Sequence, residues 1–324
     1  MNIRRSIRLS GTLSAVAARA AIAAAAMMIT GASVAQEPKG YELALVDMRG
    51  GKDVLGTLPP SVFSPRVSPD GTQVVFELAD AAPVADGTAA PTRLWIAPLD
   101  DISKRRMLPP VGTGRNLAGV WMPDGKRIVF LASGMVGADG TPAPDALYIR
   151  NADGSGEAEK LVDGRAAEGI YADGSRMNYI VLTGESDYGI WSLDMASHQG
   201  TKLVDGNGTE QHSSRVSPDG KWFAYTSNDT GRHEVWLEPL PQTGKRYKIS
   251  PNGGGHVLWA DDGLKVYFDN GGQIYRVDLF LDGKTPQAAD PEALPIKGFQ
   301  QGERRRQFDL VPGAPQFLML FPVK

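Results

Sequence analysis

The stretch VSPDGKWFAYTSNDTGRHEVWLEPL, from Val216 to Leu240, contains two β-strand patterns separated by turns. Asp219-Gly220 precedes a run rich in aromatic and β-branched residues, and a polar segment then leads to a second run that contains Val235-Trp236. Asp-Gly beside such runs is a strong hairpin signal, because both residues tolerate the positive φ of a tight turn. The stretch predicts paired strands and no helix.

The same two signals recur along the chain. Five Asp-Gly turns each precede a strand pattern, and an aliphatic residue followed by Trp or Tyr comes after each of them. The turn glycines, Gly71, Gly125, Gly174, Gly220 and Gly263, are 43 to 54 residues apart. This spacing is near the length of a four-stranded propeller blade. A lone blade cannot bury both of its faces, so each blade must stack on its neighbours.

The two ends of the chain supply the strands of one further blade. Residues 41–48 and 53–58 have the pattern of third and fourth strands, and the segment 304–324 has that of first and second strands, with Gly313-Ala314 where Asp-Gly would be expected. Pairing the first segment with the last closes the ring and removes free sheet edges. We therefore expect an all-β fold, a six-bladed β-propeller of four-stranded antiparallel blades. A β-sandwich, the alternative, would have shorter and more regular turn spacing.

Residues 1–35 have the pattern of a secretory signal peptide. A basic start, MNIRRSIR, precedes an Ala-rich apolar run, and Ser33-Val34-Ala35 provides the small residues of a cleavage site. The apolar run is interrupted by Arg19 and is shorter than the roughly 20 residues of a membrane span. We expect cleavage after Ala35, export by the Sec or the twin-arginine route, no transmembrane span, and one propeller domain over residues 36–324 in the periplasm.

Composition excludes several classes of function. Cleavage after Ala35 leaves 30 basic and 37 acidic residues, a net charge of −7, which argues against nucleic-acid binding because phosphates are bound by Lys and Arg. The chain has no cysteine and therefore no disulfide, thiolate metal site or Cys nucleophile. It also lacks a G-x-S-x-G elbow, a phosphate loop and a dinucleotide fingerprint. We expect no catalytic residue and no cofactor.

The SPDG turns, each followed by a strand and then by a strand with Val-Trp or Ile-Tyr, resemble the WD-like β-propeller repeat family and its TolB-like six-bladed members. The resemblance covers residues 41–324. Only about five residues lie between the predicted cleavage site and the first strand, so we expect this chain to lack the additional α/β domain of TolB proteins. The resemblance implies a periplasmic binding role rather than a reaction.

Propellers bind ligands at the mouth of the central channel, where the first strand of each blade begins, or on the loops of one face. His212 and His256 begin neighbouring blades, and with Glu210 they form a conceivable divalent-metal site, but no close His spacing supports one and we predict no metal. Polar residues at or near the predicted first strands are the candidates for partner or ligand binding: Glu168, Glu210, His212, Arg215, His256, Arg304 and Arg306.

The sequence therefore predicts a monomeric, exported, non-catalytic propeller that binds another envelope protein or a peptide. The alternative is a metal-assisted saccharide lyase or hydrolase with its site at the channel mouth. A convergent cluster of carboxylates and histidines around a metal would favour the enzyme, whereas a charged or apolar patch without such a cluster would favour the binding protein.

Overall fold

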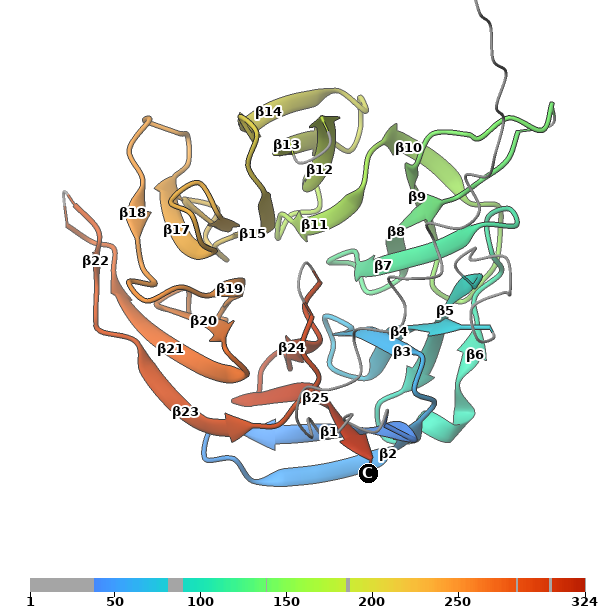
Figure 1. Cartoon of the computed structure of the whole chain (residues 1–324), viewed down its shortest axis with the longest axis horizontal. Helices are drawn as coiled ribbons and strands as arrows, with labels where there is room; N and C mark the ends of the chain where they lie inside the picture. The colour runs from blue at the N-terminus through green and yellow to red at the C-terminus, as the bar shows by residue number, and fades with distance from the viewer. Residues whose placement is uncertain are drawn as a thin grey trace, which may run out of the picture. The chain divides into compact units, whose positions relative to one another are not determined.

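The computed structural model describes residues 38–80, 90–137, 139–184, 187–283, 285–302 and 305–323. These residues form six antiparallel sheets that stand as blades around a central channel (Figure 1). The prediction of an all-β, six-bladed propeller is confirmed. The predicted signal peptide and Arg304 lie outside the described residues.

Five blades are continuous in sequence, and each begins with the strand next to the channel. Blade 1 comprises β3 (Val62–Val67), β4 (Gln73–Ala79), β5 (Thr92–Pro98) and β6 (Arg106–Met107), with the short 3-10 helix η1 (Ile102–Lys104) before β6. Blade 2 comprises β7 (Arg115–Trp121), β8 (Arg127–Ser133), β9 (Ala146–Asn151) and β10 (Glu159–Asp163). Blade 3 comprises β11 (Ala166–Ile170), β12 (Arg176–Gly184), β13 (Asp187–Asp194) and β14 (Gly200–Val204). Blade 4 comprises β15 (Gln211–Val216), β16 (Trp222–Ser227), β17 (Glu234–Pro239) and β18 (Tyr247–Lys248).

Blade 5 differs from the expected four strands. It comprises β19 (Gly255–Trp259), β20 (Lys265–Asn270) and β21 (Gln273–Phe280), and the outer edge of β21 pairs with two short strands, β22 (Gln287–Ala288) and β23 (Glu292–Lys297). Pro291 lies between these two strands. Proline has no backbone N–H to donate to a sheet, so the outer strand is interrupted there.

Blade 6 joins the two ends of the described chain. Its strands are β24 (Phe308–Leu310), β25 (Gln316–Val323), β1 (Gly40–Asp47) and β2 (Lys52–Leu58), in that order from the channel outward. β1 and β25 pair antiparallel from Gly40 opposite Val323 to Asp47 opposite Gln316. The predicted closure of the ring by N- and C-terminal strands is confirmed.

The Asp-Gly turns use glycine and aspartate differently from our expectation. Gly71, Gly220 and their equivalents have φ between 66° and 73°, whereas no turn aspartate has a positive φ. In the first turn the Asp70 carboxylate instead accepts hydrogen bonds from Ser68 Oγ (2.6 Å) and Thr72 N (3.1 Å). The sixth turn keeps this geometry without the aspartate, because Gly313 has a φ of 73°. Glycine is therefore the conformational requirement, and aspartate adds a side-chain cap.

Hydrophobic residues are buried between the blades. The described residues contain six buried apolar clusters, and each cluster joins two neighbouring blades. In β4, Val74 and Phe76 pack toward blade 6 and Val75 packs toward blade 2, since successive side chains of a strand point to opposite faces. Every blade therefore depends on both neighbours for burial.

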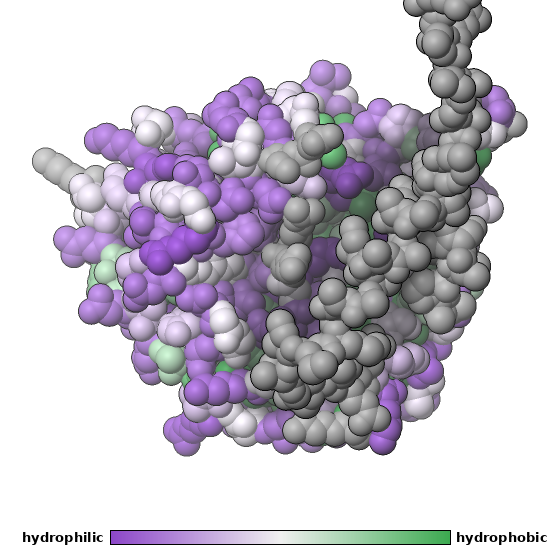
Figure 2. Space-filling view, viewed as in Figure 1, coloured by the Kyte–Doolittle hydropathy of each residue, from purple (hydrophilic) through white to green (hydrophobic). Residues whose placement is uncertain are grey.

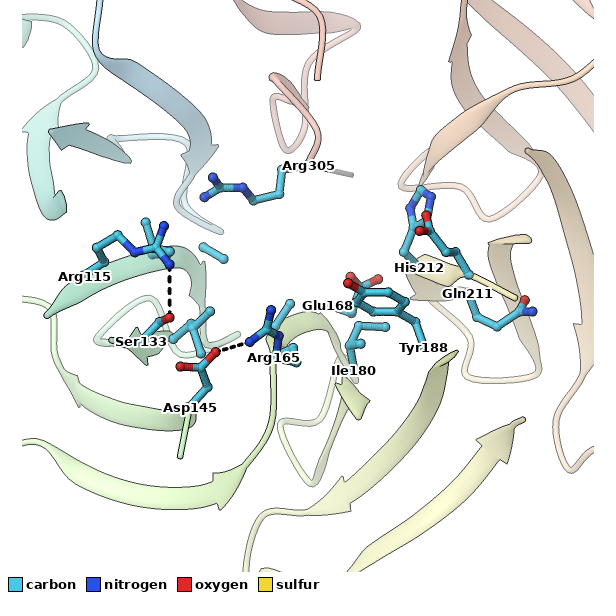
Figure 3. Close-up of a pocket in the computed structure, with 15 residues that line it drawn as sticks. Arg115, Ser133, Asp145, Arg165, Glu168, Ile180, Tyr188, Gln211, His212 and Arg305 are labelled. Atoms are coloured by element: carbon cyan, nitrogen blue, oxygen red, sulfur yellow. Dashed lines mark hydrogen bonds and ion pairs between the residues drawn. The ribbon is translucent and has the colours of Figure 1, made fainter. Parts of the chain in front are cut away.

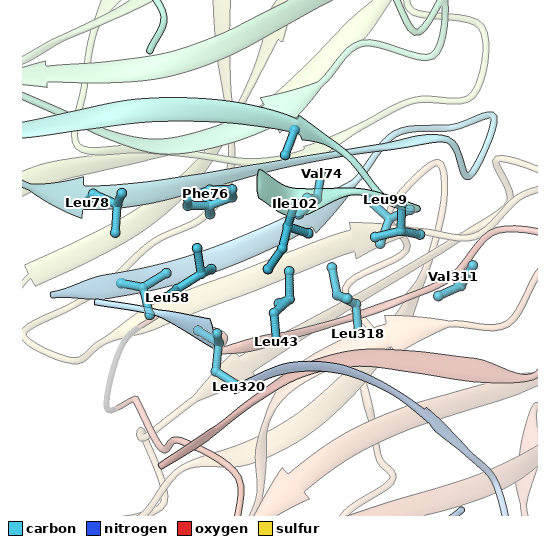
Figure 4. Packing of buried hydrophobic residues seen from close by; sticks show 13 residues of the cluster. Leu43, Leu58, Val74, Phe76, Leu78, Leu99, Ile102, Val311, Leu318 and Leu320 are labelled. Carbon is cyan, nitrogen blue, oxygen red and sulfur yellow. The ribbon is translucent and has the colours of Figure 1, made fainter. Parts of the chain in front are cut away.

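The cluster between blades 6 and 1 secures the closure (Figure 4). Leu43, Leu318 and Leu320 of blade 6 contact Val74 and Phe76 of blade 1, and all five side chains are fully buried. The face drawn in Figure 2 is mostly hydrophilic outside the grey residues. Within the described part of the chain, no helix has the length and hydropathy of a membrane span.

We expect Leu318→Ala to lower the free energy of unfolding by about 2–5 kcal/mol, because it removes a fully buried side chain from the closing cluster. Urea denaturation followed by circular dichroism measures this loss. Leu264, whose side chain is 53% exposed, provides the matched control, and Leu264→Ala should change stability by less than about 0.5 kcal/mol. Equal effects of the two substitutions would contradict the assigned packing.

Candidate functional site: a charged channel mouth

The first strand of each blade lines the channel, and five of these strands contain a bulge midway. Register shifts interrupt the pairing of β3, β7, β11, β15 and β19 with their neighbours. At four of the bulges a residue other than glycine has a φ of 52° to 56°, namely Ser64, Ala118, Ser213 and His256. Bulges of this kind redirect side chains and are common next to functional sites.

Polar side chains from neighbouring blades bind the backbone at these bulges. Glu77 Oε1 accepts from Ala118 N at 2.8 Å, Gln307 Oε1 accepts from Ser64 N at 2.9 Å, and Glu168 Oε2 accepts from Ser214 N. Each bond crosses a blade boundary. Buried donors freed by the bulges are thus satisfied, and the inner strands are fixed relative to one another.

A cavity of about 370 Å³ lies at the end of the channel where the first strands begin. We call it the channel mouth, and its charged or hydrogen-bonding lining residues include Arg115, Arg165, Glu168, Tyr188, Glu210, His212 and Arg305. Figure 3 shows that Arg115, Arg165, Arg305 and His212 lie around one common space. The structure thus brings together the predicted residues Glu168, Glu210 and His212, from blades 3 and 4.

Ion pairs hold two of the mouth arginines in place. Arg305 Nη1 lies 2.6 Å from Glu77 Oε2, and Arg165 pairs with Asp145. Both arginine side chains keep more than 40% of their surface exposed. Glu77 is 1% exposed, and it also accepts from the β7 bulge. The mouth therefore presents guanidinium donors beside carboxylate acceptors.

Three of the four histidines form a cluster at the same end of the channel. The ring centroid of His212 lies 5.0 Å from that of His233 and 5.6 Å from that of His256. His256 Nδ1 lies 2.9 Å from Asp269 Oδ1, and His212 Nδ1 lies 2.9 Å from Ser213 Oγ. The predicted proximity of His212 and His256 is present. Across the described residues, no three His, Asp or Glu side chains are arranged to hold a metal ion.

Two of the candidate arginines lie deeper than the mouth. Arg215 and Arg306 meet Arg66 in a narrow part of the channel, which we call the arginine constriction. Arg66 and Arg215 are partly exposed because they face the channel, whereas Arg306 is buried. Burial, together with repulsion by Arg306, lowers the pKa of Arg66 well below its usual range and that of Arg215 to about 9.

Glu168 lies between the mouth and the constriction. Its side chain is buried, and this burial raises the pKa of its carboxyl above the usual value. The nearby Arg215 and the hydrogen bond from Ser214 N act in the opposite direction without cancelling the effect of burial. The neutral form is thus stabilised relative to a carboxyl in water.

No protein-family model and no curated protein matches this chain. Among solved structures, a putative TolB from Agrobacterium tumefaciens has a TM-score of 0.64 and 16% identity, covering 88% of this chain and 99% of that chain. The chain has the fold of a TolB-like six-bladed propeller.

Two further solved structures are similar. A chain of a nidogen/laminin complex has a TM-score of 0.54 and 11% identity, covering 74% of this chain and 89% of that one. TolB from Acinetobacter baumannii has a TM-score of 0.49 and 16% identity, covering 81% of this chain and 63% of that one. At such identities the likeness to the TolB-like propeller concerns the fold, because function depends on the residues of the site.

We expect the Glu168→Gln variant to become more stable relative to the unchanged protein as pH rises from 4 to 7. The folded state favours protonated Glu168, so the unchanged protein loses stability as pH rises from the ordinary pKa of 4.5 toward the raised one. The glutamine side chain of the variant does not ionise, so a relative gain in its free energy of unfolding is expected as pH rises. Denaturation at each pH measures it. Glu157→Gln, at an exposed position, is the control and should show no such trend. A stability difference between Glu168→Gln and the unchanged protein that does not vary with pH would contradict the raised pKa of Glu168.

Proposed function

We propose that the mature chain is an exported, non-catalytic propeller that binds a protein or peptide of the cell envelope at the channel mouth. The observation that carries this proposal is the convergence of Arg115, Arg165 and Arg305 with Glu168 and Glu210 in one cavity. Charged donors and acceptors in one concave surface are suited to a partner segment that carries both signs of charge.

The fixed geometry of the mouth supports tight binding. Ion pairs with Glu77 and Asp145 already restrict the side chains of Arg305 and Arg165. Binding a partner therefore costs less of their conformational entropy. The residues come from separate blades, and the side chains of Glu77 and Glu168 accept hydrogen bonds from the inner strands of the next blades. A rigid scaffold with functional side chains at its strand ends is a common arrangement for binding sites.

Export is supported by the sequence of residues 1–35, which has a basic start, an apolar run and a small-residue cleavage site. We infer a periplasmic location from this leader. We also propose that the protein acts as a monomer, because the closed ring keeps the inner edge of every blade inside the channel.

We predict that a tagged full-length chain, crosslinked in the cells that make it, captures a reproducible envelope protein identified by mass spectrometry. Arg115→Ala and Arg165→Ala should each lower the recovery of that protein by about tenfold, because each removes a charge-assisted hydrogen bond to the partner. The alternative function, a metal-assisted saccharide lyase or hydrolase, is tested on the same preparation by metal analysis and a saccharide cleavage screen.

Arg127→Ala is the matched control for Arg165→Ala. Both arginines belong to exposed ion pairs, with side chains 47% and 45% exposed, but Arg127 follows an Asp-Gly turn at the opposite end of the channel. Exposed pairs contribute little to stability, so neither substitution should unfold the protein. Equal recovery with all three variants, or no protein above background with the unchanged chain, would refute the proposed site.

A further inference from the structure

Arg66 and Arg215 occupy equivalent positions on opposite sides of the channel. Each stands five residues before a turn glycine, on the first strands of blades 1 and 4 of the six-bladed ring. Arg66 Nη1 donates to the carbonyls of Pro65 (2.7 Å) and Arg306 (3.0 Å), and Arg215 Nη1 donates to those of Ser214 (2.8 Å) and Glu168. The guanidinium groups of both arginines are therefore fixed in position, and they face the channel.

Two tryptophans of the following blades hold the backbone of these arginines. Trp121 Nε1 donates to the Arg66 carbonyl at 3.1 Å, and Trp259 Nε1 donates to the Arg215 carbonyl at 3.3 Å. Both indole rings are also part of the walls of a second cavity, of about 370 Å³, at the end of the channel where the Asp-Gly turns lie. We call this space the turn-side cavity.

Arg306 adds a third guanidinium with an unused donor. Its Nε donates to the Phe308 carbonyl at 2.7 Å, and its Nη2 donates to Asp309 Oδ1 at 2.8 Å. The residue is 4% exposed, and its Nη1 has no hydrogen-bond partner among the described residues. A buried charged donor without a partner is costly, so an acceptor at this position would be strongly stabilised.

The carboxylates beside Arg66, Arg215 and Arg306 do not fully balance their positive charge. Asp309 uses Oδ1 for Arg306 and Oδ2 for Val67 N (3.0 Å), and Glu168 uses Oε2 for Ser214 N. Burial raises the pKa of the Glu168 carboxyl, whereas burial lowers the pKa of Arg306. Burial thus disfavours the charged form of Arg306, and an anion beside its guanidinium would favour that form.

The shape of the space selects the kind of anion. The constriction encloses about 50 Å³, enough for a group of a few atoms. The three arginines, Arg305 and Glu168 line it together with the small side chains of Ala118, Ala166 and Ala167. Arg66, Arg215 and Arg306 also form the floor of the turn-side cavity. The remaining walls of that cavity are mostly apolar and include Val120, Trp121, Pro123, Ile170, Trp259 and Leu310, and the carboxyl groups of Glu168, Asp261 and Asp309 also line it.

We propose that the channel binds a small monocarboxylate with an apolar body. The carboxylate lies on the guanidiniums of Arg66, Arg215 and Arg306, which match its geometry, and the apolar body lies between Trp121 and Trp259 in the turn-side cavity. The apolar part of this site lies on the far side of the constriction from the channel mouth. The proposal does not rest on the proposed protein-binding function.

Isothermal titration of the purified protein with benzoate tests the proposal. We expect one benzoate per chain, and at least tenfold weaker binding of benzamide, which has the same shape without the charge. Arg66→Gln and Arg215→Gln should each weaken benzoate binding about tenfold. Arg150→Gln is the control, because Arg150 is a buried arginine that donates to backbone carbonyls outside the constriction and the turn-side cavity.

Three results would overturn the proposal. They are equal binding of benzoate and benzamide, binding of inorganic phosphate or chloride in preference to benzoate, and benzoate binding that Arg66→Gln and Arg215→Gln leave unchanged. A crystal structure of the unchanged protein grown with saturating benzoate keeps the test independent of how the variants fold. Benzoate density between the three guanidiniums is expected, and its absence would also overturn the proposal.

Discussion

The fold depends on the pairing of β1 with β25 and on the apolar cluster that this pairing creates against blade 1. Each blade buries its hydrophobic residues only against its two neighbours, so an open ring would expose two such surfaces at once. Closure therefore completes a circular series of interfaces. The channel is a consequence of that closure, because six inner strands are held at fixed positions around it.

The same closure brings polar residues from distant parts of the sequence together. Arg305 and Glu77, separated by most of the chain, form an ion pair at the mouth, and Gln307 binds the bulge of β3. Apolar packing on the blade faces holds the polar groups of the channel in place, and those groups in turn satisfy the backbone donors that the bulges release. Because apolar packing fixes the blades and hydrogen bonds fix the polar groups of the channel, the binding surface has little conformational freedom.

The architecture was predictable from the sequence because its requirements recur. A left-handed glycine and an aliphatic–aromatic strand return in blade after blade, and any one blade identifies the others. The depth of side chains in the channel was not predictable, since it depends on bulges at Ser64, Ala118, Ser213 and His256, which are not glycines and carry no sequence signal for a positive φ. The sequence therefore predicts Arg215 and Arg306 at the mouth, and it gives no signal for Glu77, which stands in the middle of a hydrophobic strand. The equal distance of Arg66 and Arg215 from their turn glycines was the one available signal.

The most direct test of the binding account is to map which end of the channel contacts a partner in the cell. The sequence contains no cysteine, so a single introduced cysteine carries a photo-crosslinker at one known position. Tyr188→Cys places it in the channel mouth, and Lys126→Cys places it at an exposed turn on the opposite end. The account predicts a crosslinked envelope protein from Tyr188→Cys and none from Lys126→Cys. Crosslinking from Lys126→Cys alone, or from neither position, would contradict it.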